Sequence, residues 1–394
     1  MVARPAVCRL VQGFKAVSVS VRMRVLHFYK TYYPDTVGGV EQVIYQICRG
    51  AAKCGVESSV LSLTRQDADR VVELEGHAVH RARMDFEIAS NAFSASSFFR
   101  FSKLAKRADI VHYHFPWPFG DVVHFTTRHK KKTVVTYHSD IVRQKVLLKL
   151  YRPLKRRFLA DVDRIVATSP SYLETSEVLN EYRHKTEVIP IGLDKSSYPT
   201  ASPELLAKWQ SKFGERFFLF VGMIRYYKGL DFLLDAAHGT EYPVVIVGAG
   251  PVEAELKERA ARLKLHNVHF LGALSDEDKV ALLALCYAVI LPSHLRSEAF
   301  GVSLLEGAMY GKPMISCEIG TGTSYINKHN DTGLVIAPGD SNALRDAMRF
   351  LLENPCIAAE MGARAEQRYL SLFTSERMAK SYVDLYKRLL EEAP

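Results

Sequence analysis

Short apolar runs alternate with amphipathic stretches along most of this chain. The amphipathic stretches have helical periodicity, whereas the apolar runs are brief and rich in β-branched residues, which is typical of buried strands. We expect strands at 24–29, 60–63, 110–113, 134–137, 165–168, 217–221, 244–247, 268–271, 289–291 and 313–317. Strands that alternate with helices in this way predict doubly wound parallel sheets with helices on both faces.

The strands fall into two series, separated by a Pro- and Ser-containing segment near 188–203. The chain has 394 residues, which exceeds what one hydrophobic core usually supports. We therefore expect two Rossmann-like domains, at 23–195 and 196–374, with the active site in the cleft between them.

Residues 1–22 do not continue this pattern. They carry cations at both ends and a short apolar middle at 16–21, too brief for a secretory signal. We expect an N-terminal extension that contributes neither to folding nor to activity. No apolar run approaches the roughly 20 residues of a membrane span, and six scattered cysteines without C-x-x-C spacing indicate reduced core residues of a cytosolic protein.

The net charge of +9 is unevenly placed. One basic cluster occupies 128–132, and a second, at 143–157, interleaves cations with leucines and Tyr151. The second pattern suits an anionic membrane surface, although an ordinary solvated helix face gives the same pattern. Nucleic acid is not expected as a partner, because no recognition-domain signature accompanies the charge.

Two carboxylates eight residues apart, Glu298 and Glu306, lie in apolar surroundings. The first is predicted in a loop after a buried strand and the second about two turns into the following helix. Backbone N–H groups at that helix start suit an anion such as a diphosphate, and the two carboxylates suit separate hydroxyls of one elongated ligand. The simpler alternatives are an exposed loop residue and a solvated helix residue.

The stretch 291–316 resembles the nucleotide-sugar motif of retaining family 4 glycosyltransferases, and agreement in order and spacing extends from Met23 to the C-terminus. The resemblance implies the two-domain GT-B fold and a C-terminal helix, within 375–394, that crosses back to the first domain. It implies transfer of a hexose from a nucleoside diphosphate sugar to an acceptor hydroxyl, with retention of configuration. It also implies that no metal ion or other cofactor is needed.

Within this resemblance, Glu298 would fix the donor sugar and Glu306 the ribose. Backbone groups at Phe300, Gly301 and Val302 would hold the diphosphate. The glycine pair Gly38 and Gly39, after the first strand, corresponds to a loop that contacts the donor diphosphate. The alternative for that pair is an ordinary turn.

The loop after the strand at 217–221 would supply cations for the departing diphosphate. Lys228 matches the family lysine, but Met223 stands where the family has arginine. Arg225, two positions later, is the expected substitute. A solvated turn is the alternative for both cations.

On the acceptor side, His114 aligns with the family histidine that contacts the donor sugar, and His138 and Asp140 follow the next strand. Histidine there can donate to a sugar hydroxyl or polarise an acceptor. Trp117 could pack on an acceptor sugar or lipid, or in the core.

Two further motifs imitate known sites. The strand at 244–247 leads into Gly248 and Gly250 but lacks the third glycine of a dinucleotide loop, so we expect these glycines to be structural. Asp161 and Asp163 form a D-x-D pair ahead of a buried strand, and we assign no metal to them.

The opening 23–42 resembles bacterial O-antigen mannosyltransferases and D-rhamnosyltransferases. That implies GDP-mannose or GDP-D-rhamnose as donor and an undecaprenyl-diphosphate-linked sugar as acceptor, at the inner face of the cytoplasmic membrane. Two alternatives remain: a GT-B nucleotide-sugar epimerase, which would consume donor without acceptor, and a non-catalytic nucleotide-binding or nucleic-acid-binding protein.

Overall fold

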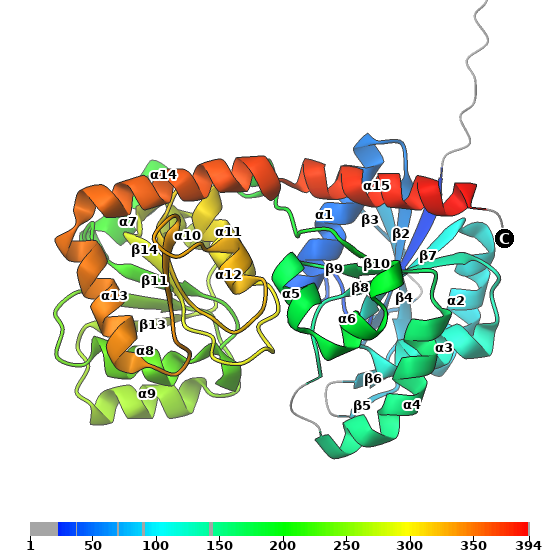
Figure 1. The fold of residues 1–394 in the computed structure, drawn as a ribbon, viewed down its shortest axis with the longest axis horizontal. Coiled ribbons are helices and arrows are strands. Elements are labelled where there is room, and N and C mark those ends of the chain that lie inside the picture. The colour runs from blue at the N-terminus through cyan, green and yellow to red at the C-terminus, as the bar shows by residue number, and fades with distance from the viewer. Residues whose placement is uncertain (1–22, 37, 69–70, 89–90, 142–144, 393–394) are drawn as a thin grey trace, which may run out of the picture.

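The computed structural model describes residues 23–36, 38–68, 71–88, 91–141 and 145–392. Two α/β lobes lie side by side, each built on a largely parallel sheet with helices on both faces (Figure 1). The predicted extension at 1–22 lies outside the described residues. The expected pair of Rossmann-like folds is confirmed.

The first lobe contains an eight-stranded sheet in the order β10-β9-β8-β7-β1-β2-β4-β3, in which β3 pairs antiparallel. Its strands are β1 (Arg24–Phe28), β2 (Glu57–Thr64), β3 (Val72–Leu74), β4 (His77–Arg83), β7 (Ile110–Phe115), β8 (Lys132–Tyr137), β9 (Arg164–Ala167) and β10 (Thr186–Val188). A separate hairpin joins β5 (Phe86–Ile88) to β6 (Asn91–Phe93).

The second lobe contains a six-stranded parallel sheet in the order β13-β12-β11-β14-β15-β16. Its strands are β11 (Phe218–Val221), β12 (Val244–Val247), β13 (Val268–Gly272), β14 (Ala288–Leu291), β15 (Met314–Cys317) and β16 (Gly333–Ile336). The four central strands β11, β12, β14 and β15 are buried along their whole length, which explains their continuous apolar sequences.

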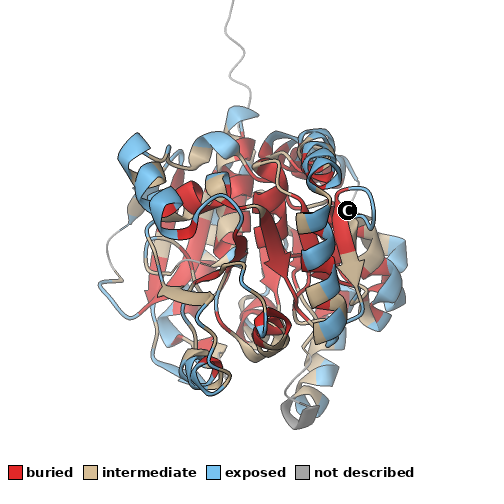
Figure 2. Ribbon diagram, turned by 90° about the vertical axis from the view of Figure 1, so that its left-hand side faces the viewer, coloured by how far each residue is buried: buried red, intermediate tan, exposed pale blue. Residues whose placement is uncertain are grey.

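Helices cover both sheets, and Figure 2 shows buried strands inside helices whose outer sides are exposed. The first lobe has α1 (Gly39–Lys53), α2 (Ala95–Arg107), α3 (Pro118–Thr127), α4 (Lys145–Asp161), α5 (Pro170–Thr175) and α6 (Glu177–Glu181). The second has α7 (Pro203–Phe213), α8 (Leu230–Ala237), α9 (Glu253–Arg262), α10 (Asp276–Leu285), α11 (Val302–Met309), α12 (Thr323–Ile326), α13 (Ser341–Glu353) and α14 (Pro355–Leu372).

The last helix, α15 (Ser375–Glu391), follows α14 and lies along the first lobe (Figure 1). It packs closely on α1, because a Cβ added at Gly50 would lie 2.4 Å from the Cβ of Ala379. On the sheet below, the hydroxyl of Tyr386 lies 2.7 Å from Nδ1 of His112. The chain therefore joins the lobes twice, once near 189–202 and again at the start of α15.

Candidate functional site

In the second sheet the strand order reverses between β11 and β14, so the loops that follow these neighbouring strands meet at their carboxyl ends. Ligands of open α/β sheets bind at such a point. The loops approach very closely: Gly229 has φ 68, and a Cβ there would lie 2.1 Å from the carbonyl oxygen of Pro292. Only glycine fits, and its position brings Lys228 to Glu298.

The ammonium group of Lys228 donates to Oε2 of Glu298, and the hydroxyl of Ser293 donates to the same oxygen at 3.3 Å. Glu298 is 8% exposed. Burial by itself would lower the pKa of Lys228, but the Glu298 carboxylate and Tyr227 together outweigh burial and raise that pKa. Lys228 thus stays charged beside the carboxylate.

Glu306, on α11, is held in the same way. Its Oε1 accepts from the hydroxyl of Tyr198 at 3.0 Å and from Nζ of Lys279 at 3.3 Å. Lys279 also contacts Asp276 at 3.0 Å. Burial opposes the charge of Lys279, yet Glu306 and Asp276 together raise its pKa.

Each glutamate therefore uses one carboxylate oxygen for a lysine and a hydroxyl. No hydrogen bond from the described residues reaches Oε1 of Glu298 or Oε2 of Glu306. With exposures of 8% and 6%, neither the exposed-loop nor the solvated-helix alternative holds. Each carboxylate is oriented by its partners and keeps one acceptor for a ligand hydroxyl.

Two helix N-termini face each other across the lobes. Gly301 caps α11 in the left-handed region, with φ 94 and ψ 60, and no side chain caps that end. At the start of α1, a Cβ built on Gly39 would lie 3.9 Å from Cγ2 of Val302. Both positive helix ends and their N–H groups converge, an arrangement that favours an anion.

Gly38 also has a local packing role, since a Cβ there would lie 2.5 Å from Oε2 of Glu41. Phe300, just before α11, is 4% exposed, and its side chain belongs to the hydrophobic core.

Arg225 makes no hydrogen bond to Glu298 among the described residues, but its charge acts on Lys228, where it opposes the rise in pKa. Its Nε lies 2.9 Å from the sulfur of Met223, the residue in the family arginine's position. Burial lowers the pKa of Lys30 in the first lobe, and the charge of Arg225 lowers it further. The charge of Arg225 thus acts on cations of both lobes, whereas Lys228 is anchored to Glu298 within the second.

On the first lobe, His114 lies within β7 and is 2% exposed. Its Nε2 lies 3.1 Å from Nδ1 of His27, and its Nδ1 lies 3.0 Å from Nε2 of His138. Both ring nitrogens are therefore engaged by other histidines. Burial lowers the pKa of His27 and of His138 to about 3, so these rings are neutral at physiological pH.

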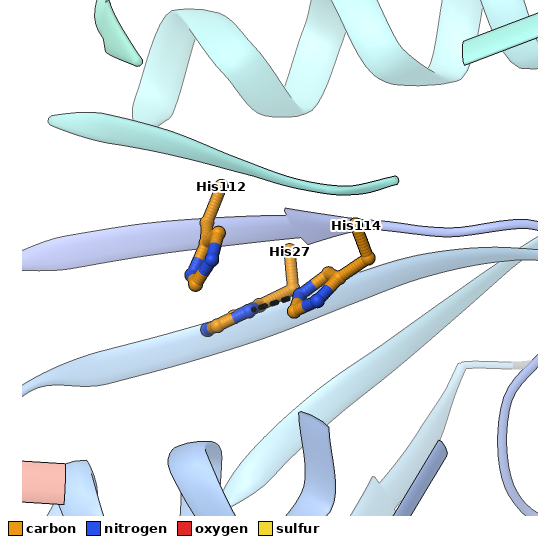
Figure 3. Close-up of side chains that lie close together, drawn as sticks. All are labelled: His27, His112 and His114. Atoms are coloured by element: carbon orange, nitrogen blue, oxygen red, sulfur yellow. Dashed lines mark hydrogen bonds between the residues drawn. The ribbon is translucent and has the colours of Figure 1, made fainter. Parts of the chain in front are cut away.

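Figure 3 shows His27, His112 and His114 together on one face of the sheet. One nitrogen from each ring lies within 4.8 Å of the other two. A metal ion needs lone pairs that converge on one point. Instead, the rings are nearly stacked: the plane of the His114 ring makes an angle of only 20° with that of His27 and 25° with that of His112. The nitrogens of His112 contact the hydroxyls of Tyr386 and Thr136, both at 2.7 Å. This geometry is that of a hydrogen-bonded network.

Asp140 links the lobes: its carboxylate accepts from the hydroxyl of Tyr137 at 2.9 Å and contacts the guanidinium of Arg296 at 3.3 Å. Trp117, in contrast, is 2% exposed, packs on Phe28 and donates to the carbonyl oxygen of Ala92 at 3.1 Å. Of the two alternatives for Trp117, core packing therefore holds, and its placement on the acceptor side is wrong.

The remaining motifs have structural roles. A Cβ at Gly248 or Gly250 would lie 2.0 Å from a carbonyl oxygen of the loop after β11. Asp161 contacts His124 at 2.7 Å, and Asp163 accepts from the backbone and the hydroxyl of Thr133, both at 2.7 Å.

Sequence reasoning missed four residues that complete the site. They are Tyr198, Lys279, Ser293 and Arg296. None of the four is one of the glutamates or the lysine that the family motif singles out. Tyr198 lies in the linker and Lys279 on α10, and no local sequence pattern pairs either residue with Glu306.

Comparisons with known proteins identify the family. Residues 37–197 match the family described as Glycosyltransferase Family 4, and residues 202–368 match Glycosyl transferases group 1. The chain belongs to these glycosyltransferases. It is 63% identical over 353 residues to the D-rhamnosyltransferase WbpZ of Pseudomonas aeruginosa, covering 90% of this chain and 93% of the relative.

It is also 51% identical over 369 residues to the O-antigen chain mannosyltransferase C of Escherichia coli, covering 94% of this chain and 99% of the relative. A solved sucrose-phosphate synthase from Thermosynechococcus elongatus superimposes with a TM-score of 0.77 at 20% identity, covering 94% of this chain and 100% of that one. WaaG, a glycosyltransferase involved in lipopolysaccharide biosynthesis, superimposes with a TM-score of 0.66 at 16% identity, and the match covers 92% of this chain and 99% of that one. These structures confirm the GT-B fold, and the relatives confirm a glycosyltransferase.

Proposed function

We propose that this glycosyltransferase moves mannose or D-rhamnose, with retention of configuration, from a GDP-sugar to a sugar on a lipid diphosphate during O-antigen assembly. The observation that carries the proposal is the pair of oriented glutamates within a chain 63% and 51% identical to a D-rhamnosyltransferase and an O-antigen mannosyltransferase. The two relatives differ in the sugar they are named for, so the donor sugar is the point to be tested.

The donor would lie along the carboxyl ends of β11 and β14. Glu306 Oε2 would accept from a ribose hydroxyl and Glu298 Oε1 from a sugar hydroxyl. The diphosphate would meet the N-termini of α1 and α11, at Gly38, Gly39, Gly301 and Val302. Lys228 and Arg225 would offset the charge that develops on the leaving diphosphate.

A donor phosphate oxygen could take the acceptor proton, so this scheme assigns no general base. His138 and Asp140, at the end of β8, would line the acceptor side. No residue of the scheme requires a metal ion, since the cationic groups near the diphosphate come from side chains and helix ends.

We further propose that the first lobe rests on an anionic membrane surface, which would bring it to a lipid-linked acceptor. On α4, Lys149 and Arg152 are exposed, and Leu150 between them is 77% exposed. Exposed cations beside an exposed leucine suit the interface of an anionic bilayer. Among the described residues, no helix is long and apolar enough to cross a bilayer.

The test is to incubate the protein with GDP-D-rhamnose, GDP-mannose, UDP-glucose and a dTDP-sugar, with and without a short-chain GlcNAc-diphospholipid. We expect transfer from one of the GDP-sugars, dependent on the acceptor, and an α-linked product from an α-linked donor. Conversion of donor to an isomer without acceptor would support the epimerase instead. Binding of nucleotide with no turnover for any pair would support a non-catalytic protein.

A further inference from the structure

One guanidinium group joins the two lobes beside the candidate donor site. Arg296, in the loop between β14 and α11, donates from Nη1 to the hydroxyl of Thr175 at 2.8 Å, and its Nη2 contacts Oδ2 of Asp140 at 3.3 Å. Thr175 ends α5 and Asp140 follows β8, so both partners belong to the first lobe. Figure 1 shows α5 at the side of the first lobe that faces the second. This junction exists only while the two lobes are together.

The guanidinium is fixed from both sides. Within its own lobe, Nη1 of Arg296 also donates to the carbonyl oxygen of Gly320 at 2.8 Å. In the first lobe, the other carboxylate oxygen of Asp140 accepts from the hydroxyl of Tyr137 at 2.9 Å. An isolated exposed ion pair contributes little, but here the two side chains are only 30% and 21% exposed. The planar fork of an arginine can serve several acceptors at once, which a lysine ammonium cannot do in the same geometry.

Arg296 lies inside the turn that carries Glu298. The backbone N–H of Glu298 donates to the carbonyl oxygen of Leu295 at 3.0 Å, so Arg296 and Ser297 are the two central residues of that turn. The carbonyl oxygen of Glu298 accepts from the hydroxyl of Thr321 at 2.8 Å, in the segment that also holds the guanidinium. A shift of Arg296 is therefore transmitted to Glu298 through the turn.

The residue after Glu298 also reaches the first lobe. Ala299 is 8% exposed, and it belongs to a hydrophobic cluster whose other described members all come from the first lobe. The carboxylate of Glu298, in contrast, is held by Lys228 and Ser293 of the second lobe. The side chain of Glu298 is thus oriented by one lobe, while the backbone around it is located against the other.

We propose that Arg296 is a positioning residue that ties the turn of Glu298 to the acceptor lobe, so that this carboxylate is correctly placed against the donor sugar only while the lobes are together. The contact between Glu298 and the sugar rests on the proposed function, whereas the tie between the lobes does not. Arg296 itself touches no substrate in this scheme. Its effect on transfer passes through Glu298.

Hydrogen exchange on the full-length protein without ligand tests the tie directly. Thr175→Val removes the hydroxyl and keeps the shape, Asp140→Asn removes the charge, and Arg296→Met removes the whole junction. All three should speed exchange in peptides that span 297–300. In Arg296→Met the increase should exceed about fivefold, the most that one exposed ion pair contributes. The matched control is Arg349→Met, whose ion pairs lie on α13, and it should leave these peptides unchanged.

The two first-lobe variants are decisive in that experiment, because they lie far from the turn in sequence. Faster exchange in either of them supports the tie. Unchanged exchange in both would overturn the proposal whatever Arg296→Met does, since the contacts of the turn would then be confined to the second lobe.

Kinetics separate positioning from direct contact. With GDP-mannose or GDP-D-rhamnose and a short-chain GlcNAc-diphospholipid, Arg296→Met should lower kcat/KM by more than about fivefold, and Arg349→Met should not. In a Glu298→Gln background the same change should cost less, because both variants then affect one contact. Losses that simply add would show that Arg296 meets a substrate by itself, and would overturn the proposal.

Binding of GDP alone is the last control, because GDP has no sugar for Glu298 to meet. Calorimetry should give the same affinity for GDP in Arg296→Met and in Arg349→Met. A loss of GDP affinity as large as the loss in kcat/KM would indicate a general loosening of the lobes instead, and would also overturn the proposal. If neither GDP-sugar supports transfer, the proposed donor is wrong, and hydrogen exchange still decides the tie.

Discussion

At the scale of single residues, the site is defined by how buried carboxylates are oriented. Glu298 and Glu306 each give one oxygen to a lysine and a hydroxyl and keep the other for a ligand. The lysines would therefore serve a ligand indirectly, by holding both carboxylates in a fixed orientation.

We expect Glu306→Gln to raise the KM for the nucleotide sugar by about 10- to 150-fold, which corresponds to about 1.5–3 kcal/mol for a hydrogen bond to a charged group. Glutamine keeps the side-chain volume but removes the charge. Initial rates at varied donor concentration give the KM. The matched control is Glu277→Gln, which makes the same change at an exposed position of α10. Equal KM values for both variants would remove Glu306 from the donor site.

The two cations after β11 should differ in their effects. Lys228 is bound to Glu298, whereas Arg225 contacts Met223. We expect Lys228→Met to reduce kcat more than Arg225→Met, because only the first change also leaves the Glu298 carboxylate without its buried cation. Single-turnover rates with saturating donor measure this. A larger loss in Arg225→Met would show that Arg225 carries the main charge toward the leaving diphosphate.

Metal removal is a third test at this scale. Asp161 and Asp163 are engaged by His124 and Thr133, and the proposed diphosphate site is supplied with cations by the chain itself. We expect EDTA to leave the transfer rate largely unchanged. Complete inhibition that Mg²⁺ or Mn²⁺ reverses would contradict this prediction.

At the scale of elements, α15 is tied to the first sheet by polar as well as apolar contacts. Tyr386 contacts His112, and Tyr382 contacts Thr136 at 2.8 Å, all within the buried face below the helix. A buried polar atom that loses its partner costs about 1–3 kcal/mol. We therefore expect Tyr386→Phe to lower the free energy of unfolding by that amount in urea melts. The control is Lys387→Ala, one residue away but exposed, and a Tyr386→Phe variant as stable as that control would contradict the prediction.

Sequence patterns predicted the fully buried strands well and the polar or short ones poorly. The runs at 244–247 and 289–291 are continuous and apolar because both faces of their sheet are covered. In contrast, β4 contains two histidines and two arginines, and β10 has only three residues of intermediate exposure. Their pairing is set by neighbours distant in sequence, so local composition did not reveal them.

The candidate site was also predicted only in part: residues within sequence motifs were found, and residues that meet them only through the fold were not. Glu298, Glu306 and Lys228 lie in motifs with fixed spacing, which a single sequence can display. Tyr198, however, is 108 positions from the Glu306 carboxylate that it contacts. The contacts of His114 with His27 and His138 were missed for the same reason, since these histidines come together only when β1, β7 and β8 assemble.

At the scale of the whole molecule, the proposed lipid-linked acceptor raises the question of how the protein reaches a membrane surface. The structure divides the basic stretch of α4 into two groups. Arg156 pairs with Glu181 at 3.2 Å, and Arg157 lies 4.8 Å above the ring of Phe125, so these two cations serve the fold. Lys149 and Arg152 are exposed, and among the described residues no ion pair engages them. The first lobe thus retains cations that are available to an anionic surface.

We expect the double variant Lys149→Gln/Arg152→Gln to bind vesicles of anionic lipid more weakly than the wild type, by about 1 kcal/mol per cation, or roughly fivefold each. Binding of the wild type should itself weaken as salt rises. Sedimentation with phosphatidylglycerol vesicles measures both effects. The matched control is Lys380→Gln/Lys387→Gln, which makes the same change in net charge on exposed positions of α15.

The acceptor separates membrane docking from catalysis. If docking is the role of Lys149 and Arg152, their variant should lose transfer to a long-chain lipid acceptor in vesicles and keep transfer to a soluble short-chain analogue, because the chemistry lies at the carboxyl ends of the strands. An equal fall with both acceptors would place the two cations in the active site or the folding core. Vesicle binding equal to that of the α15 control would identify them as part of an ordinary solvated face, and contact with the membrane would then have to come from another surface of the molecule.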